Sequence, residues 1–453
     1  MKHTIIRTAA VLLACLCVLS GCLASASSYA ILEAAYPEMA PYPNEQDFID
    51  PVSGFWDSDG FEEVYEAWRT SRIEQRSQPE GYTEGAAAFT RRAAETFLTD
   101  ADGNAVISPL NVYLTLGMLA EVTGGESREQ ILALLGADSM DTLRRRAGSL
   151  WNANYCDDGA LTSVLASSLW LDRDVAYRTE PLEMLASVYH ASSYQGEMGD
   201  PAFDKALQTW LNEQTGGLLQ EAAEKLTMSP ETILTLASTV YYQAKWKNEF
   251  REENNAERTF HSPAGDVACT FMTQTDTYGV YYWSQQFGAV ARPMEEGGRM
   301  WLILPDEGVD TDAVLRSDAL YNLLDPAYEW TDRKTLIIHQ YIPKFDISSD
   351  RDILEGLAAL GITDVMDPAA ADFTPLTDTE GAYLSRAEHT VRVAIDEDGV
   401  TAAAFTAMMT AGAAMPPEEE MDFVLDRPFL FAITGQDDVI LFMGVLERPW
   451  QQP

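Results

Sequence analysis

Residues 399–417 read GVTAAAFTAMMTAGAAMPP, a run of nineteen residues without a charged side chain. Acidic triplets bound this run on both sides, at 396–398 and at 418–420, in a chain that is acidic throughout. Seven of the nineteen residues are alanine, so the composition alone allows a helix, a flexible loop or a buried strand. The flanking sequence has to decide between these three conformations.

The segments on either side favour an extended conformation. Residues 386–397 have the pattern of a strand, and Pro416 with Pro417 prevents either a helix or strand pairing from continuing. Successive side chains of a strand point to opposite faces of its sheet. One face would then carry Val400, Ala402, Ala404, Thr406 and Met408. We predict a strand-like extension whose side chains on that face are small enough to enter a sheet.

From about Gly85 onward, helical and strand patterns mix without a linker rich in Pro, Gly or Ser, which predicts one large α+β domain. Ser108 followed by Pro109 is typical of a helix start. Ser127 with Gln130 predicts a capping box for the next helix. Further helices are expected at 202–215 and 350–360. Predicted strands, rich in β-branched and aromatic residues, lie at 232–243, 300–304, 335–347, 423–434 and 439–446.

The N-terminus has the pattern of an export signal. Lys2 and Arg7 precede an apolar run at 9–19 that is too short for a permanent membrane helix. The run ends in Leu-Ser-Gly-Cys at 19–22, which resembles the lipobox of bacterial lipoproteins, where the cysteine is acylated and becomes the first mature residue. We therefore expect a signal peptide at 1–21 and a lipid on Cys22, which tethers an exported body to the outer face of the cell membrane or the cell surface. The alternative is an uncleaved anchor in which Cys22 is an ordinary residue.

Residues 22–85 are rich in Pro, Ser and acidic residues and predict a spacer that holds the body away from the membrane. One amphipathic helix is expected within this spacer, at 61–76, because Phe61, Tyr65 and Trp68 would share a face.

Charge and motif content exclude several classes of protein. Seventy-one acidic and thirty basic residues give a net charge of -41, which repels nucleic acid. The motifs G-x-S-x-G, H-E-x-x-H, the P-loop and C-x-x-C are absent, and the five histidines show no metal-ligand spacing. We therefore expect no enzyme and no metal or other cofactor. Cys156 and Cys269 would remain in the exported body, either as a disulfide or as two buried thiols.

Seven segments, in order, resemble the serpin family, and the resemblance covers residues 86 to 449. The first three are NAVISPLN (104–111), TGGESREQI (123–131) and ASSLW (166–170). The others are WLNEQTGG (210–217), STVYYQAKWKNEF (238–250), YIPKF (341–345) and DRPFLF (426–431). The resemblance implies a serpin domain at 86–453, with three β-sheets, about eight to nine helices and an exposed reactive-centre loop. It also implies a monomeric inhibitor that a serine protease cuts in this loop, after which the acyl-enzyme is trapped as the loop inserts into a sheet.

In inhibitory serpins the loop begins with a hinge of Glu, a variable residue, Gly and then small residues before a Thr. Residues 397–406 resemble this hinge, although Val400 replaces the usual Thr or Ser and Phe405 replaces a small residue. The hinge residues implied are Glu397, Gly399, Val400, Thr401, Ala402, Ala403, Ala404 and Thr406. Counting along the hinge places the scissile bond between Ala413 and Ala414. Alanine at that position suits an elastase-like or subtilisin-like protease with a small primary pocket.

Beneath the insertion site, serpins keep a polar cluster, the shutter, where two strands part. The resemblance places Ser108, Asn111, Ser238 and His389 there, with the amide of Asn111 and the hydroxyl of Ser238 exchanged relative to the usual pattern. Trp246 matches the tryptophan where the loop enters the sheet. The alternative function is a non-inhibitory serpin that acts as a binding scaffold or a protease substrate.

Overall fold

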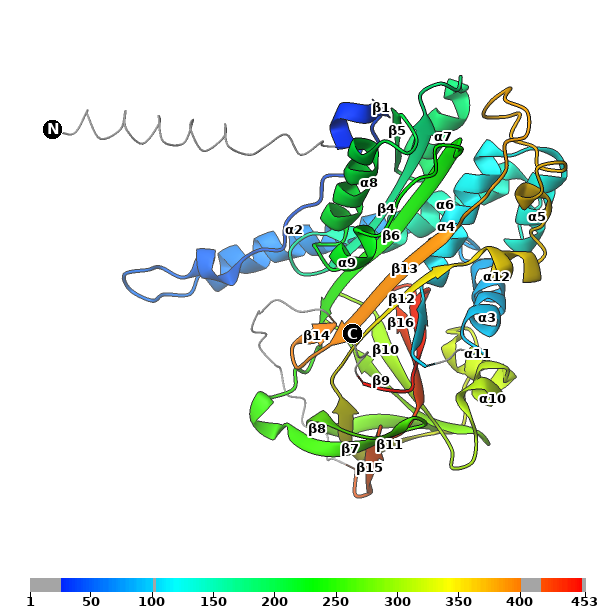
Figure 1. Cartoon of the computed structure of the whole chain (residues 1–453). Coiled ribbons are helices and arrows are strands. Elements are labelled where there is room, and N and C mark those ends of the chain that lie inside the picture. The colour runs from blue at the N-terminus through cyan, green and yellow to red at the C-terminus, as the bar shows by residue number, and fades with distance from the viewer. Residues whose placement is uncertain (1–25, 101–102, 401–416, 450–453) are drawn as a thin grey trace.

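The computed structural model describes residues 26–100, 103–400 and 417–449. Helices and one large sheet build the upper part of the molecule in Figure 1, and a second sheet builds the lower part. Among the described residues, no helix combines the length and the apolar character needed to cross a membrane.

The first sheet has eight strands, joined in the order β1-β5-β4-β6-β14-β13-β12, with β3 paired to β4. Strands β4 and β6 pair over ten residues and strands β12 and β13 over eight, both antiparallel. Only the two residues of β14 lie between these two halves of the sheet. The strands are β1 (Ala30–Leu32), β3 (Cys156–Asp157), β4 (Thr162–Asp172), β5 (Ala191–Gly196), β6 (Leu234–Lys245), β12 (Phe345–Asp352), β13 (Glu388–Ile395) and β14 (Gly399–Val400).

The second sheet has nine strands, in the order β15-β11-β8-β9-β10-β16-β17-β2, with β7 paired to β8. The 19 residues of β8 pair with β7 at one end and β9 at the other, and with β11 between. Because β8 joins both groups of strands, two sheets are observed where three were expected. The strands are β2 (Ala105–Ile107), β7 (Ala256–Ser262), β8 (Gly265–Trp283), β9 (Phe287–Pro293), β10 (Arg299–Pro305), β11 (Arg333–Pro343), β15 (Glu420–Val424), β16 (Phe429–Thr434) and β17 (Ile440–Leu446).

Ten α-helices lie in the described part of residues 84–449, slightly more than expected because some, such as α9 and α10, are only four and five residues long. Helix α4 begins as predicted, since the Ser108 hydroxyl accepts a hydrogen bond from the Asn111 amide at 3.4 Å. Every residue of α4 except Thr115 is buried. The helices are α3 (Ala86–Phe97), α4 (Pro109–Val122), α5 (Gly125–Leu134), α6 (Met140–Asn154), α7 (Thr179–Val188), α8 (Pro201–Gln214), α9 (Gln220–Ala223), α10 (Thr311–Leu315), α11 (Asp318–Leu324) and α12 (Leu354–Ala359).

Two of the predicted strands are each divided. The strand predicted at 335–347 becomes β11 and β12, which belong to different sheets and separate at Lys344. The strand predicted at 423–434 becomes β15 and β16, because β15 pairs with β11 whereas β16 pairs with β10. The capping box at Ser127 is also wrong: α5 begins at Gly125, and the Ser127 hydroxyl instead accepts a hydrogen bond from the Asp372 amide at 3.2 Å.

Much of the predicted spacer is folded onto the domain. After η1 (Ala26–Tyr29), strand β1 extends the first sheet by pairing with β5. The predicted helix is present as α2 (Ser58–Arg76), preceded by η2 (Glu45–Phe48). Trp68 and Arg72 of α2 are buried against Asp158, which accepts a hydrogen bond from Trp68 Nε1 at 3.1 Å and forms a salt bridge with Arg72 at 3.3 Å. The predicted helix is therefore held against the domain by these aromatic and charged side chains.

Candidate loop-insertion site

The start of the predicted hinge lies between two strands of the first sheet. Gly399 pairs with Lys245 and Val400 with Ala244, both on β6, and Val400 also pairs with Ile395 on β13. A Cβ at position 399 would collide with the backbone of β6, so only glycine fits at this point. Val400 is 2% exposed and belongs to the main core. The first two residues after the turn thus already occupy the place of an additional strand.

Trp246 fixes the turn that leads into β14. Its backbone amide donates a hydrogen bond to the Asp398 carbonyl, and its indole Nε1 donates one to the Asp396 carbonyl, both at 2.9 Å. The Asp396 carboxylate in turn accepts hydrogen bonds from the amides of Asp398 and Gly399 at 3.0 and 3.1 Å. Trp246 itself is almost fully buried. The predicted loop-entry residue therefore contacts the hinge directly.

Glu397, the first predicted hinge residue, is held by two residues that lie just before strands β12 and β7. Its carboxylate forms a salt bridge with Lys344 and accepts a hydrogen bond from the Asn255 side chain. Burial alone would raise the pKa of Glu397, but the hydrogen bonds from Lys344 and Asn255 outweigh burial and lower it. The carboxylate therefore stays ionised and keeps the base of the loop in place.

Arg292 lies under the turn and was not singled out from the sequence. Its guanidinium is 5.1 Å from the ring centroid of Trp246 and 4.0 Å from that of Phe250. It donates hydrogen bonds to Gln340 at 2.7 Å and Gln274 at 2.8 Å. Burial lowers the pKa of Arg292 to about 9. A single arginine in β9 gives no local pattern, so only the assembled fold reveals this support for Trp246.

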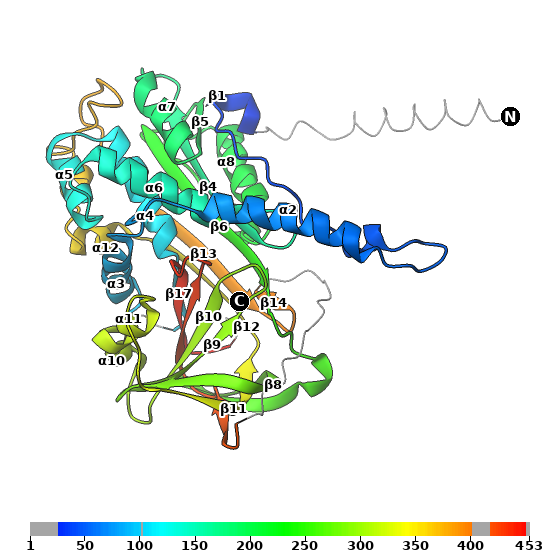
Figure 2. The ribbon, with the colours of Figure 1, turned by 180° about the vertical axis from the view of Figure 1, so that it is seen from behind.

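Beyond β14, the described residues of β6 and β13 share no run of paired backbone, although the two strands lie side by side in both views (Figures 1 and 2). On its other side β6 pairs with β4, and β13 pairs with β12. Each strand therefore presents one edge toward the other without a ladder between them. Such edges are ready to accept an additional strand.

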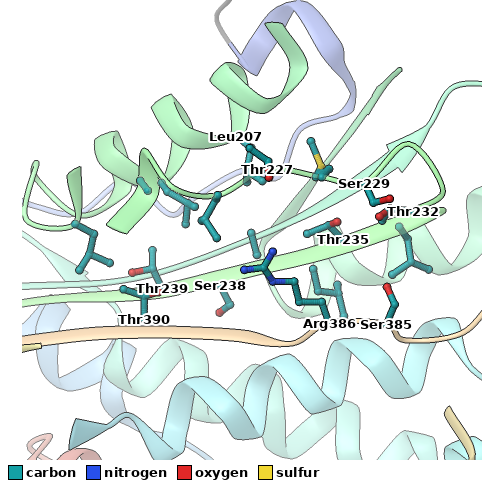
Figure 3. Close-up of a pocket in the computed structure, with 18 of the residues that line it drawn as sticks. Leu207, Thr227, Ser229, Thr232, Thr235, Ser238, Thr239, Ser385, Arg386 and Thr390 are labelled. Carbon is teal, nitrogen blue, oxygen red and sulfur yellow. The ribbon is translucent and has the colours of Figure 1, made fainter. Parts of the chain in front are cut away.

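A cavity of about 540 Å³ lies over this division, between the sheet and α8 with α9. Figure 3 shows Arg386 reaching into the cavity beside Ser238, Thr239 and Thr390. On the opposite face of the sheet, a smaller cavity of about 40 Å³ is lined by residues of α4, β6 and α12 and by His389. The division between β6 and β13 thus has open space on both faces.

The structure brings the four predicted shutter residues together at the start of α4. On the β6 side, the Ser238 hydroxyl donates a hydrogen bond to Asn111 Oδ1 and lies 3.1 Å from the Ser167 hydroxyl of β4. On the β13 side, the Ser108 amide donates to His389 Nε2 at 3.1 Å. Each half of the sheet is thus bonded to the start of α4 separately. Ser167 was not predicted as a member of this cluster, because β4 contains three serines and nothing local distinguishes Ser167 from Ser163 and Ser168.

His389 is neutral in this arrangement. Its Nε2 accepts a hydrogen bond from the backbone amide of Ser108, so the proton of the neutral ring lies on Nδ1. Burial, and secondarily the charge of Arg351, lower the pKa of His389 from 6.5 to about 4. The Ser108 hydroxyl completes the link by donating to the Leu441 carbonyl of β17 at 2.7 Å.

The remaining predicted site residues lie outside the described part of the chain. They are the hinge residues Thr401, Ala402, Ala403, Ala404 and Thr406, the predicted scissile pair Ala413 and Ala414, and Cys22. The two cysteines of the described residues, Cys156 and Cys269, are both free and buried, so they are thiols and do not form a disulfide with each other.

Comparison with known proteins supports the architecture. A family model described as "Serpin (serine protease inhibitor)" matches residues 84–449. The chain is 28% identical to the leukocyte elastase inhibitor of Sus scrofa over 381 residues, covering 80% of this chain and 99% of that protein. It is 26% identical to Serpin B11 of Mus musculus over 370 residues, covering 76% and 93%.

Solved structures show the same fold. The thermophilic serpin tengpin in its native state matches with a TM-score of 0.72 at 23% identity, covering 82% of this chain and 95% of that one. Serpin48 of the insect Tenebrio molitor matches with a TM-score of 0.67 at 20% identity, covering 82% and 99%. The family model describes serine protease inhibitors, which are not enzymes. The family model covers most of the chain, and the strand order and the hinge between β6 and β13 agree with it. The chain therefore belongs to the serpin family.

Proposed function

We propose that this serpin is an inhibitor that traps a serine protease by inserting its cut loop between β6 and β13. The observation that carries this proposal is β14. Gly399 and Val400 already pair with both neighbouring strands, whereas β6 and β13 share no ladder in the described residues that follow. Insertion would extend β14 along edges that are already separated.

Loop insertion releases energy because unpaired backbone becomes paired. If about a dozen loop residues each gain ~1 kcal/mol from sheet hydrogen bonds, the total is on the order of 10 kcal/mol. This energy becomes available only when a protease cuts the loop and frees one end. An acyl-enzyme carried along with the inserting strand is displaced before water can release it.

Val400 sets which loop side chains enter the core. It points into the main core together with Val391 and Val393 of β13. Because side chains alternate along a strand, Ala402, Ala404 and Thr406 would follow Val400 into the core, and all three are small. Phe405 would point to the opposite face, toward α8, where the large cavity lies. The unusual phenylalanine is therefore compatible with insertion.

The target class follows from the predicted scissile bond. Alanine at 413 presents a methyl group to the primary pocket of the protease, which suits elastase-like or subtilisin-like enzymes. The similarity to a protein named leukocyte elastase inhibitor supports the same choice. The lipobox at 19–22 supports export and a lipid on Cys22, as in a bacterial lipoprotein, which would keep a monomeric inhibitor at the outer face of the membrane or the cell surface.

The experiment mixes the protein with pancreatic elastase and, separately, with subtilisin, and examines the products by denaturing gel electrophoresis. We expect a covalent adduct that survives denaturation, with cleavage located by mass spectrometry between Ala413 and Ala414. Ala404→Glu should abolish the adduct and leave a cleaved substrate, since a carboxylate would have to enter the core. Ala403→Glu is the matched control, because after insertion the side chain at 403 would face away from the core, and it should retain the adduct.

Cleavage without an adduct by both proteases would refute inhibition of this class of enzyme. It would favour the alternative function, a serpin that is a substrate or a binding scaffold. Equal adduct yields from Ala404→Glu and Ala403→Glu would instead show that the loop does not insert with the side chain of residue 404 on the same face of the sheet as Val400.

A further inference from the structure

An arm projects from the body on the side of η1, formed by η2, the hairpin at 49–56 and helix α2 (Figures 1 and 2). We call residues 49–56 the tip. The arm precedes the residues that match the family model, which begin at 84. It is therefore an addition to the serpin domain and requires its own explanation.

The tip exposes apolar side chains. Val52 is 95% exposed, Phe55 68%, Ile49 37% and Trp56 36%. These four side chains lie within eight consecutive residues, whereas the other large exposed apolar side chains of the described chain are spread over several elements. Such a concentration is typical of a surface that contacts an apolar partner.

The hairpin gives the tip a defined shape. Ile49 and Trp56 form a bridge across it, and the Asp50 amide donates a hydrogen bond to the Phe55 carbonyl at 2.8 Å. The Asp50 carboxylate accepts hydrogen bonds from the amides of Val52 at 3.0 Å and Ser53 at 2.6 Å. The charged group of the hairpin is thus bonded to its own backbone, while the apolar side chains extend outward.

The arm is fixed to the body at its other end. Aromatic contacts run from Trp56 to Phe61, then to Tyr65 and Trp68, with centroid separations of 5.2, 5.8 and 5.5 Å. Trp68 is buried and hydrogen-bonded to Asp158, which also pairs with Arg72. The tip is therefore presented at a set position relative to the serpin domain.

The place where the N-terminal chain joins the body indicates what the tip contacts. Ala26 is buried, and the neighbouring Tyr29 packs on Phe203 of α8 at a centroid separation of 4.9 Å. Only residues 23–25 separate Ala26 from Cys22, so a lipid on Cys22 would lie within about 14 Å of the body. Helix α2 extends the tip about 16 Å beyond Trp68, on the same side of the molecule. A membrane that holds Cys22 thus lies within reach of the tip.

We propose that the tip inserts into the interfacial layer of the membrane that anchors Cys22, as a second contact that sets the orientation of the inhibitor. This proposal rests on the lipid anchor proposed above. Tryptophan and phenylalanine favour the boundary between the headgroups and the acyl chains of a membrane. The exposed face of α2 carries Glu62, Glu63 and Glu66. These carboxylates would repel anionic lipids, so the apolar tip suits a membrane with uncharged headgroups.

The test places the photo-reactive residue p-benzoylphenylalanine at the tip, as Phe55→p-benzoylphenylalanine, in the full chain. The matched control carries the same residue at Tyr383, an exposed aromatic position between η4 (Asp364–Met366) and β13. The acylated proteins are reconstituted into phosphatidylcholine vesicles and irradiated. We expect the phospholipid adduct to be about tenfold more abundant from position 55 than from position 383. Equal adduct yields would overturn the proposal.

Two further readouts separate the tip from the anchor. The mass of the N-terminal peptide reports whether Cys22 is acylated, independently of irradiation. If it is not, the anchor is wrong, and coupling the chain through its N-terminal cysteines to vesicles with maleimide headgroups still decides whether the tip meets lipid. Irradiation of native membranes that yields a protein adduct at position 55 in place of a phospholipid adduct would show that the tip docks on a protein and would overturn the proposal.

Discussion

Lowering the pH from 8 to 5 should destabilise the intact protein through His389. The ring is buried, and its Nε2 accepts a hydrogen bond from the Ser108 amide at 3.1 Å, so the fold holds the neutral form. Burial, and secondarily Arg351, lower the pKa of His389 from 6.5 to about 4. A proton on Nε2 would break the bond that links β13 to the start of α4.

The sign and size follow from proton linkage. Between pH 6.5 and about 4 the unfolded chain binds a proton at this position and the folded chain does not, so the free energy of unfolding falls as the pH falls. The slope approaches about 1.4 kcal/mol per pH unit. At pH 5 the loss relative to pH 8 is about 2 kcal/mol.

The assay compares urea unfolding of the native protein and of His389→Asn at pH 8, 6.5 and 5. Burial raises the pKa of other groups, such as Asp396 and Asp437, and these stabilise the fold at low pH, but both proteins carry them. The difference in pH dependence between the two proteins therefore isolates His389. His389→Asn should lose about 2 kcal/mol less than the native protein on going from pH 8 to pH 5. Identical pH dependence in both proteins would refute a buried neutral histidine.

Three further outcomes follow from the contacts. Asp158→Asn should lower the free energy of urea unfolding by about 3 to 5 kcal/mol, because it removes the salt-bridge partner of the buried Arg72. An unchanged midpoint would contradict the docking of α2. Gly399→Ala should displace β14, because its Cβ collides with the backbone of β6, and should lower the melting temperature; a native melting temperature would contradict this packing. Burial raises the pKa of Cys156, and that of Cys269 to about 11, so iodoacetamide at pH 8 should modify these two thiols only after denaturation. If mass spectrometry finds either thiol modified in the native protein, that result contradicts their burial.

The elements that could be predicted from the sequence are those that depend on residues close together in the chain. The start of α4 needs only Ser108, Pro109 and the amide three residues on, so its pattern is complete within one turn of helix. Strand β6 is similarly evident from its β-branched and aromatic residues. The polar cluster was predicted from a family resemblance that spans the chain, because its members are brought together by the sheet and α4.

Long-range contacts explain what the sequence could not predict. Trp68 and Asp158 are 90 residues apart, and neither lies in a pattern that indicates its partner. The Ser127 hydroxyl has the spacing of a cap, but a bond to the Asp372 amide, 245 residues away, takes its place. The split at Lys344 depends on which sheet each strand joins, which the continuous β-branched run does not reveal.

The most direct test of loop insertion compares the melting temperature of the intact protein with that of the protein cut once within residues 401–416. If the freed segment extends β14 between β6 and β13, the gain on the order of 10 kcal/mol should raise the melting temperature of a domain of this size by about 10 °C or more. A cut protein that melts at or below the temperature of the intact protein would contradict insertion, and with it the proposed mechanism of inhibition.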